Sequence, residues 1–234
     1  MNIPERIAGY RTERRAVACP LPKGGERKVD VLCVADLETM VDRDRLLRDP
    51  EAPDPPYWAI VWIGARAVAG RLLGSPPPVS SVLDLGCGLG LAGVAAGIAG
   101  SPVCFADIIP EALEFARANA LMNGLSDFET KVLDFTRDRL DRSFELILAA
   151  DVAYRPDHYR PLADFLDAHT SAGGTILLTE SLRADARAVL DMLIDRGFAD
   201  TKVPVWVEEE GRLERTWVHE LQRRGRPAGN APPH

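Results

Sequence analysis

Short apolar runs alternate with longer segments of helical periodicity through residues 57–222. The apolar runs predict strands at residues 82–85, 103–107, 128–133, 144–150 and 174–179. The periodic segments predict helices at residues 57–73, 91–100, 110–123, 157–169 and 182–196. Residues 201–208 and 214–221 flank Glu209-Glu-Gly-Arg212 and predict an antiparallel hairpin. This alternation predicts an open α/β sheet, mostly parallel, that ends in the hairpin.

The N-terminal part has a different pattern. Residues 14–22 and 28–35 alternate loosely around Gly24-Gly25, which predicts a β-hairpin outside the main sheet. Residues 36–48 carry apolar side chains at helical spacing, and four prolines in residues 50–56 predict a stiff connector. The expected organisation is an accessory part at residues 1–56, a main domain at 57–222 and a disordered tail at 223–234.

A glycine-rich turn joins the first strand of the main domain to an alanine-rich helix. Gly86, Gly88 and Gly90 predict a sharp turn that a ligand can approach where a side chain would obstruct it. Gly88, Gly90 and Gly93 also match the G-x-G-x-x-G of dinucleotide enzymes, a pattern that recurs in many α/β sheets. The turn therefore predicts a small-molecule site, with NAD as one candidate ligand.

Aspartates stand where four successive predicted strands end: Asp84, Asp107, Asp134 and Asp151. The carboxyl ends of parallel strands meet at one edge of a sheet, which is where such sheets bind ligands. A carboxylate repels a pyrophosphate but attracts an ammonium or sulfonium group, so the row favours S-adenosylmethionine over NAD. Taken singly, each aspartate could instead be a turn or helix-cap residue.

This array resembles the class I, seven-strand methyltransferases over roughly residues 57–222. The resemblance implies a Rossmann-like, doubly wound sheet and S-adenosylmethionine as the cofactor. It also implies that Asp84 and the glycine turn hold the methionine part of the cofactor. Asp107 would then take the ribose hydroxyls, and Asp134 with Phe135 would border the adenine.

Two pairs of residues lie four positions apart on predicted helices. Trp58 and Trp62 would share one face of the helix at 57–73, where they pack into the core unless Trp62 reaches the cofactor. Asn119 and Asn123 lie near the end of the helix at 110–123 and are predicted to cap it.

The tetrad Asp151-Val-Ala-Tyr154 follows the fourth strand of the main domain. It resembles the D-x-x-Y/F signature of the family 16 protein lysine methyltransferases. Together with residues 56–62 it is most similar to their branch that acts on the electron transfer flavoprotein β subunit. The resemblance implies a protein substrate, with Asp151 holding the lysine ammonium and Tyr154 offering its ring face or hydroxyl. Alternatively, Asp151 caps the turn and Tyr154 packs against the following helix.

Other activities are less well supported by the sequence. His158 could act as a general base for an oxygen nucleophile, but its position better suits an exposed residue in the first turn of a helix. A small-molecule N- or O-methyltransferase would have the same cofactor residues. The alternative outside the enzymes is a nucleotide- or NAD-binding module that catalyses no reaction.

The formal charge of −7 and pI near 5.2 disfavour binding to nucleic acid or anionic membranes and suit a cationic substrate. No segment has the roughly 18–20 consecutive apolar residues of a membrane span, and residues 1–6 lack the apolar core of a signal peptide. The expected location is therefore the cytoplasm. The four cysteines have no zinc-like spacing, so neither a metal site nor a disulfide is predicted.

Overall fold

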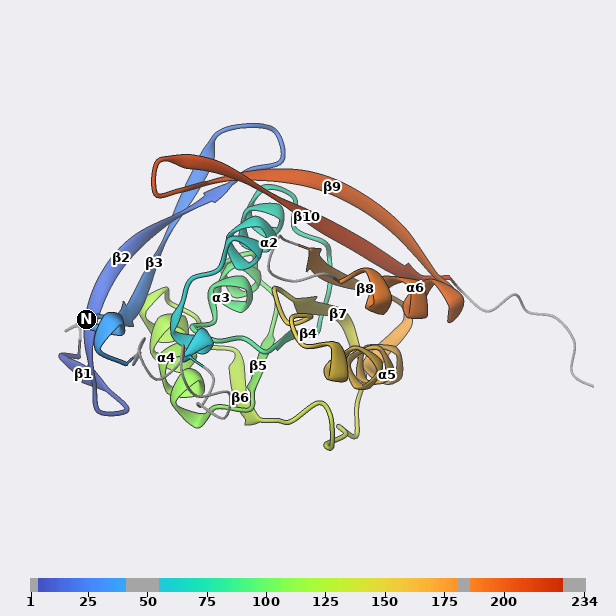
Figure 1. Ribbon diagram of the computed structural model, residues 1–234, viewed down its shortest axis with the longest axis horizontal. Coiled ribbons are helices and arrows are strands. Elements are labelled where there is room, and N and C mark those ends of the chain that lie inside the picture. Colours follow the sequence, from blue (N-terminus) through green and yellow to red (C-terminus); the bar gives the residue numbers. More distant parts are fainter. Residues whose placement is uncertain (1–3, 41–54, 181–185, 225–234) are drawn as a thin grey trace, which may run out of the picture.

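Seven strands form the main sheet in the order β6-β5-β4-β7-β8-β10-β9 (Figure 1). The computed structural model describes residues 4–40, 55–180 and 186–224. The strands are β4 (Val82–Leu85), β5 (Val103–Asp107), β6 (Phe128–Val132), β7 (Phe144–Ala149), β8 (Thr170–Glu180), β9 (Phe198–Glu209) and β10 (Arg212–Arg223). The first five in spatial order run parallel, whereas β10 is antiparallel to both β8 and β9. The predicted fold class is confirmed.

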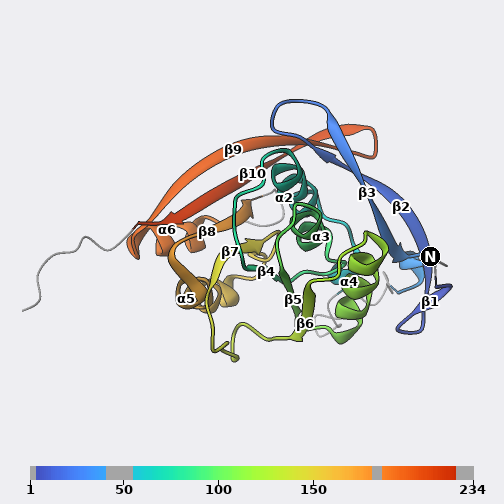
Figure 2. The same cartoon turned by 180° about the vertical axis from the view of Figure 1, so that it is seen from behind.

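Helices cover both faces of the sheet (Figures 1 and 2). One face carries α2 (Ile63–Gly74), α3 (Leu91–Ile98) and α4 (Pro110–Met122), and the other carries the 3-10 helix η3 (Pro156–His158), α5 (Tyr159–His169) and α6 (Arg187–Asp195). Alternation along β7 shows why both faces are apolar. Leu146 and Leu148 belong to the core under α2, α3 and α4, while Ile147 and Ala149 belong to the core under α5 and α6.

The order of the strands reverses at β4. From β4 the chain passes to β5 and β6 on one side, and then crosses to β7 on the other side. In open α/β sheets, ligands bind in the crevice beyond the carboxyl ends of the two strands where this reversal occurs. The topology therefore places a crevice beyond β4 and β7.

A second, antiparallel sheet of three strands lies outside the helices: β1 (Arg6–Ile7), β2 (Tyr10–Pro20) and β3 (Glu26–Val34). The hairpin predicted around Gly24-Gly25 is confirmed, because Pro20 pairs with Glu26 across it. Its strands arch over α2 and α4 (Figures 1 and 2). Arg66 of α2 donates to the carbonyl of Ala18 at 2.9 Å and to that of Glu208 at 2.8 Å, so it joins this hairpin to the C-terminal one.

The helix predicted at residues 57–73 begins later than expected. A 3-10 turn, η2 (Tyr57–Ala59), is followed by extended backbone at Ile60 and Trp62, and α2 starts only at Ile63. Trp58 and Trp62 therefore do not share a helix face. The ring centroid of Trp58 lies 5.6 Å from that of Phe115 in the core, and both tryptophans also line the crevice.

Several predicted segments lie outside the described residues. After the 3-10 helix η1 (Leu37–Met40), the remainder of the segment at 36–48 and most of the proline-rich connector fall in this category. So do the first residues of the helix predicted at 182–196 and the tail from residue 225 onward. Within the described ranges, no helix is both long enough and apolar enough to cross a membrane.

Candidate active site

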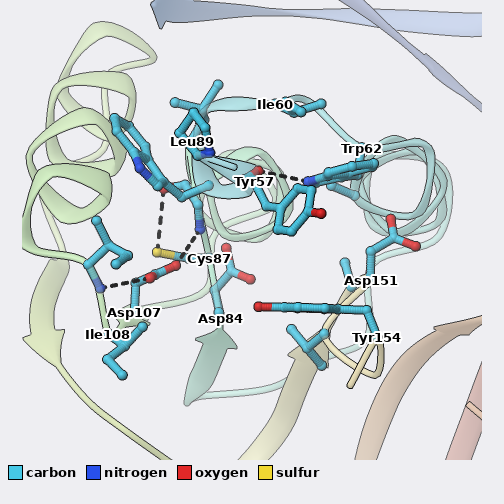
Figure 3. A pocket seen from close by; sticks show the side chains of 18 of the residues that line it. Tyr57, Ile60, Trp62, Asp84, Cys87, Leu89, Asp107, Ile108, Asp151 and Tyr154 are labelled. Carbon is cyan, nitrogen blue, oxygen red and sulfur yellow. Dashed lines mark hydrogen bonds between the residues drawn. The ribbon is translucent and has the colours of Figure 1, made fainter. Parts of the chain in front are cut away.

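A cavity of about 540 Å³ opens beyond the carboxyl ends of β4 and β7 (Figure 3). Nine of the ten predicted site residues line it: Trp62, Asp84, Gly86, Gly88, Asp107, Asp134, Phe135, Asp151 and Tyr154. The prediction that four strand-end aspartates share one edge is therefore confirmed. Gly90 is the exception and does not line the cavity.

The glycine turn bends as predicted, but its glycines have a different steric role from the one expected. Gly86, Gly88 and Gly90 all have positive φ, at 64°, 52° and 80°. A Cβ atom on Gly88 would lie 2.9 Å from the carbonyl oxygen of Trp58, and one on Gly90 would lie 2.8 Å from the Cβ of Ala116. The space that a side chain would need at these two positions is therefore occupied by other atoms of the protein.

Asp84 is buried at the floor of the cavity, with 2% of its surface exposed. Its Oδ2 accepts a hydrogen bond of 2.8 Å from the backbone N–H of Gly93 at the start of α3. Burial raises the pKa of Asp84 to about 7, and the nearby charge of Asp107 adds to the rise. A cation in the cavity would favour the ionised form, so this carboxyl group suits a positively charged ligand.

Asp107 is fixed by backbone N–H groups on both sides. Its Oδ2 accepts from Gly88 at 2.9 Å, and its Oδ1 accepts from Ile109 at 3.0 Å (Figure 3). Burial raises the pKa of Asp107, and these hydrogen bonds oppose the rise. The carboxylate thereby links the glycine turn to the end of β5, at the cavity wall.

Asp134 forms a local turn, as expected under the alternative interpretation of the strand-end aspartates. Its Oδ1 accepts from the backbone N–H of Thr136 at 2.9 Å and from the Thr136 hydroxyl at 2.6 Å, and these bonds lower its pKa. The next residue, Phe135, meets the ring of His158 edge-on at 5.7 Å. His158 lies in η3 and lines the same cavity, with 30% of its side chain exposed.

Asp151 has a strained backbone at the rim of the cavity. Its φ is 54°, in the left-handed region that few residues other than glycine adopt. The backbone N–H of Asp151 donates to Thr179 Oγ1 at 2.9 Å, and its Oδ2 accepts from the backbone N–H of Gly64 at 2.8 Å. Asp151 therefore caps the start of α2, and its carboxylate lies near Trp62 at the rim of the cavity, turned toward the start of this helix (Figure 3).

Three aromatic rings lie on the same side of the cavity as Asp151 (Figure 3). The ring centroid of Tyr57 is 5.9 Å from that of Trp62 and 5.8 Å from that of Tyr154. The indole N–H of Trp62 donates to the Tyr57 carbonyl at 2.9 Å. Sequence reasoning missed Tyr57 because it assigned this residue to a helix. Tyr57 instead lies in the 3-10 turn η2, and extended backbone at Ile60 and Trp62 separates it from α2.

Solved structures define the class of fold. The N-methyltransferase NodS from Bradyrhizobium japonicum WM9, in complex with S-adenosyl-L-homocysteine, matches with a TM-score of 0.58 at 18% identity. That match covers 80% of this chain and 96% of NodS. A putative RNA methyltransferase from Pyrococcus horikoshii matches with a TM-score of 0.55 at 14% identity, over 74% of this chain and 90% of that one. The chain has the methyltransferase fold.

The chain belongs to the lysine methyltransferase family, whose sequence profile matches residues 70–193. The electron transfer flavoprotein β subunit lysine methyltransferase of Xenopus laevis is 37% identical over 130 residues, which are 53% of this chain and 51% of the relative. The protein of that name from Danio rerio is 35% identical, over 54% of this chain and 49% of the relative. The matched region spans about half the length of these curated relatives.

Proposed function

We propose that this protein is an S-adenosylmethionine-dependent methyltransferase that transfers a methyl group to a lysine side chain of another protein. The observation that carries the proposal is one cavity with two chemically different walls. Asp84 and Asp107 lie in the inner wall, whereas Asp151, Tyr154 and Tyr57 form the rim. Membership of the lysine methyltransferase family supports the same reaction.

The inner wall suits the proposed cofactor in size and in chemistry. A volume of about 540 Å³ falls within the range of sites for ligands of this size. Asp84 and Asp107 would accept hydrogen bonds from ammonium and hydroxyl groups, and Phe135 offers an apolar surface. When bound, the cofactor supplies a methyl group that is activated by a positively charged sulfur.

The rim would orient the lysine. The carboxylate of Asp151 would hold the ammonium by a charge-assisted hydrogen bond, and the rings of Tyr57 and Tyr154 would offer their faces to the same cation. Tyr154 is 46% exposed, so a proton leaving the amine has a path to water. The main contribution of the rim is then alignment of a neutral amine, which needs no dedicated base.

The proposed substrate is the electron transfer flavoprotein β subunit. Relatives named for that activity in Xenopus laevis and Danio rerio are 37% and 35% identical to this chain over the matched region. We also propose that the protein acts in the cytoplasm.

Incubation with S-adenosylmethionine labelled in the methyl group, together with a cell extract, tests the proposal. We expect label in a protein band that yields methyllysine on hydrolysis. Purified electron transfer flavoprotein should be labelled, and the Asp151→Asn enzyme should leave it unlabelled. Label found only in small solutes would instead indicate a small-molecule methyltransferase. In calorimetry, binding of NAD without binding of S-adenosylhomocysteine would indicate a nucleotide-binding module.

A further inference from the structure

Asn119 is a buried polar residue on α4 that the proposed reaction does not use. It was predicted to cap the helix, but its side chain is fully buried and faces the N-terminal sheet. Its Nδ2 donates to the carbonyl of Leu32 at 3.2 Å, and its Oδ1 accepts from the backbone N–H of Leu32 at 2.6 Å. The amide thus pairs with the outer edge of β3 as a neighbouring strand would.

The same amide reaches the glycine turn at the cavity. The Nδ2 of Asn119 also donates to the carbonyl of Leu89 at 2.8 Å, and Leu89 is a lining residue of the cavity. One amide hydrogen of Asn119 therefore bonds to the accessory sheet, and the other bonds to the glycine turn. Asn119 is a bridge between residue 32 of the accessory sheet and residues 86–90 of the candidate cofactor wall.

A second contact joins the same two regions. Tyr10 of β2 lines the cavity, and its ring centroid lies 5.7 Å from that of Trp58. The carbonyl of Trp58 in turn lies against Gly88, where it would be 2.9 Å from an added Cβ. The accessory sheet therefore supports the glycine turn from two directions.

We propose that Asn119 is a positioning residue that holds residues 86–90 in place against β3, so that the N-terminal sheet sets the affinity for the cofactor. Without the amide, the N–H and carbonyl of Leu32 and the carbonyl of Leu89 would be buried without a partner. The glycine turn would then lose its fixed position. The effect on affinity rests on the proposed function, whereas the effect on the turn does not.

Asn123 provides a matched control on the same helix. Its Nδ2 donates to the carbonyl of Asp30 at 2.8 Å and to the carbonyl of Asn119 at 2.9 Å, so it also joins α4 to β3 and caps the helix. Neither of these hydrogen bonds involves residues 86–90. Asn123→Ala should destabilise the fold without releasing the glycine turn.

Hydrogen–deuterium exchange and calorimetry with S-adenosylhomocysteine test the proposal. In Asn119→Ala we expect the amides of residues 86–90 to exchange at least about tenfold faster, and the dissociation constant to rise about tenfold. In Asn123→Ala both quantities should stay within about twofold of wild type, although its melting temperature falls. Unchanged exchange at residues 86–90 in Asn119→Ala would overturn the proposal.

Because hydrogen–deuterium exchange does not depend on the cofactor, it tests the role of Asn119 independently of the proposed function. If the wild-type protein bound no S-adenosylhomocysteine, the proposed function would fail, while the exchange at residues 86–90 would still decide the role of Asn119. If Asn119→Ala did not fold, native-state exchange of the wild type in increasing urea would take its place. The amide of Leu32 and those of residues 88–90 should then open as one unit, and separate opening would overturn the proposal.

Discussion

The inner wall and the rim of the cavity are built in opposite ways. Asp84 and Asp107 are buried, and their hydrogen-bond partners Gly93, Gly88 and Ile109 lie within 19 residues of them along the chain. Asp151 is instead held by Gly64, which is 87 residues away. The two carboxylates of the inner wall are therefore fixed by partners that are near in the chain, whereas the carboxylate of the rim depends on the packing of the whole domain. Variants of the rim should change substrate handling while leaving cofactor binding intact.

Asp151→Asn should have the largest effect. The amide keeps the size of the side chain and can still accept from Gly64, but it loses the charge that would hold the lysine ammonium. We expect methyl transfer to fall at least about 100-fold, while the affinity for S-adenosylhomocysteine stays within about threefold of wild type. Initial rates with labelled cofactor and calorimetry measure the two quantities. Asp157→Asn, at an exposed carboxylate that pairs with Arg155, is the control and should stay active.

Gly64→Ala should give a similar result through geometry alone. An added Cβ would lie 2.3 Å from the Oδ2 of Asp151 and 2.3 Å from the Oγ1 of Thr179, so the carboxylate must move. The rate falls strongly when a group that positions a reactant is displaced. We therefore expect kcat to fall about 10- to 100-fold. Cofactor affinity should again be preserved. Wild-type turnover by Gly64→Ala would show that Asp151 is not needed in its present position.

On the inner wall, Asp84→Asn should weaken binding of S-adenosylmethionine about tenfold and remove a pH dependence. The pKa of Asp84 is about 7 in the ligand-free protein, and a bound cation would lower it. Below that pH, binding must also displace a proton, so wild-type affinity should fall up to about tenfold per pH unit. Titrations between about pH 5.5 and 7.5 measure this slope. Asp134→Asn, whose carboxyl pKa is lowered by Thr136, should keep the slope.

The raised pKa of Asp84 affects the stability of the fold in the opposite direction from its effect on cofactor affinity: stability falls as the pH rises. The pKa of Asp84 is raised from 3.8 to about 7 on folding, so its contribution to stability is present below pH 3.8 and is lost as the pH rises through about 7. Ligand-free Asp84→Asn should therefore melt at least as high as wild type at about pH 8, and the difference should shrink toward pH 5. A variant that is less stable than wild type at the higher pH would show that the carboxylate is not penalised by its burial.

The two carboxylates of the inner wall could be predicted from the sequence because their hydrogen-bond partners are near in the chain. A strand that ends in aspartate, followed by a glycine turn, fixes Asp84 and Asp107 relative to each other once the strands are parallel. The start of α2 could not be predicted, because Trp62 offers no capping side chain and the cap comes from Asp151. Asn119 was misassigned for the same reason, since its partners lie 87 and 30 residues away.

Tyr57→Leu should have the smallest effect, and it tests whether the aromatic rings belong to the rim. The ring of Tyr57 contacts those of Trp62 and Tyr154 beside Asp151, where it would face the lysine cation. An exposed cation–π contact is worth about 0.5–1 kcal/mol, so KM for the protein substrate should rise about two- to fivefold at nearly constant kcat.

Tyr57→Phe should stay close to wild type, because it keeps the ring and changes only the hydroxyl. Trp206→Leu removes a ring on β9 that is 54% exposed and does not line the cavity, so it controls for general loss of aromatic surface. If Tyr57→Leu instead weakened S-adenosylhomocysteine binding and left KM for the protein unchanged, this ring would belong to the inner wall. The boundary between the inner wall and the rim would then lie between Tyr57 and Asp151.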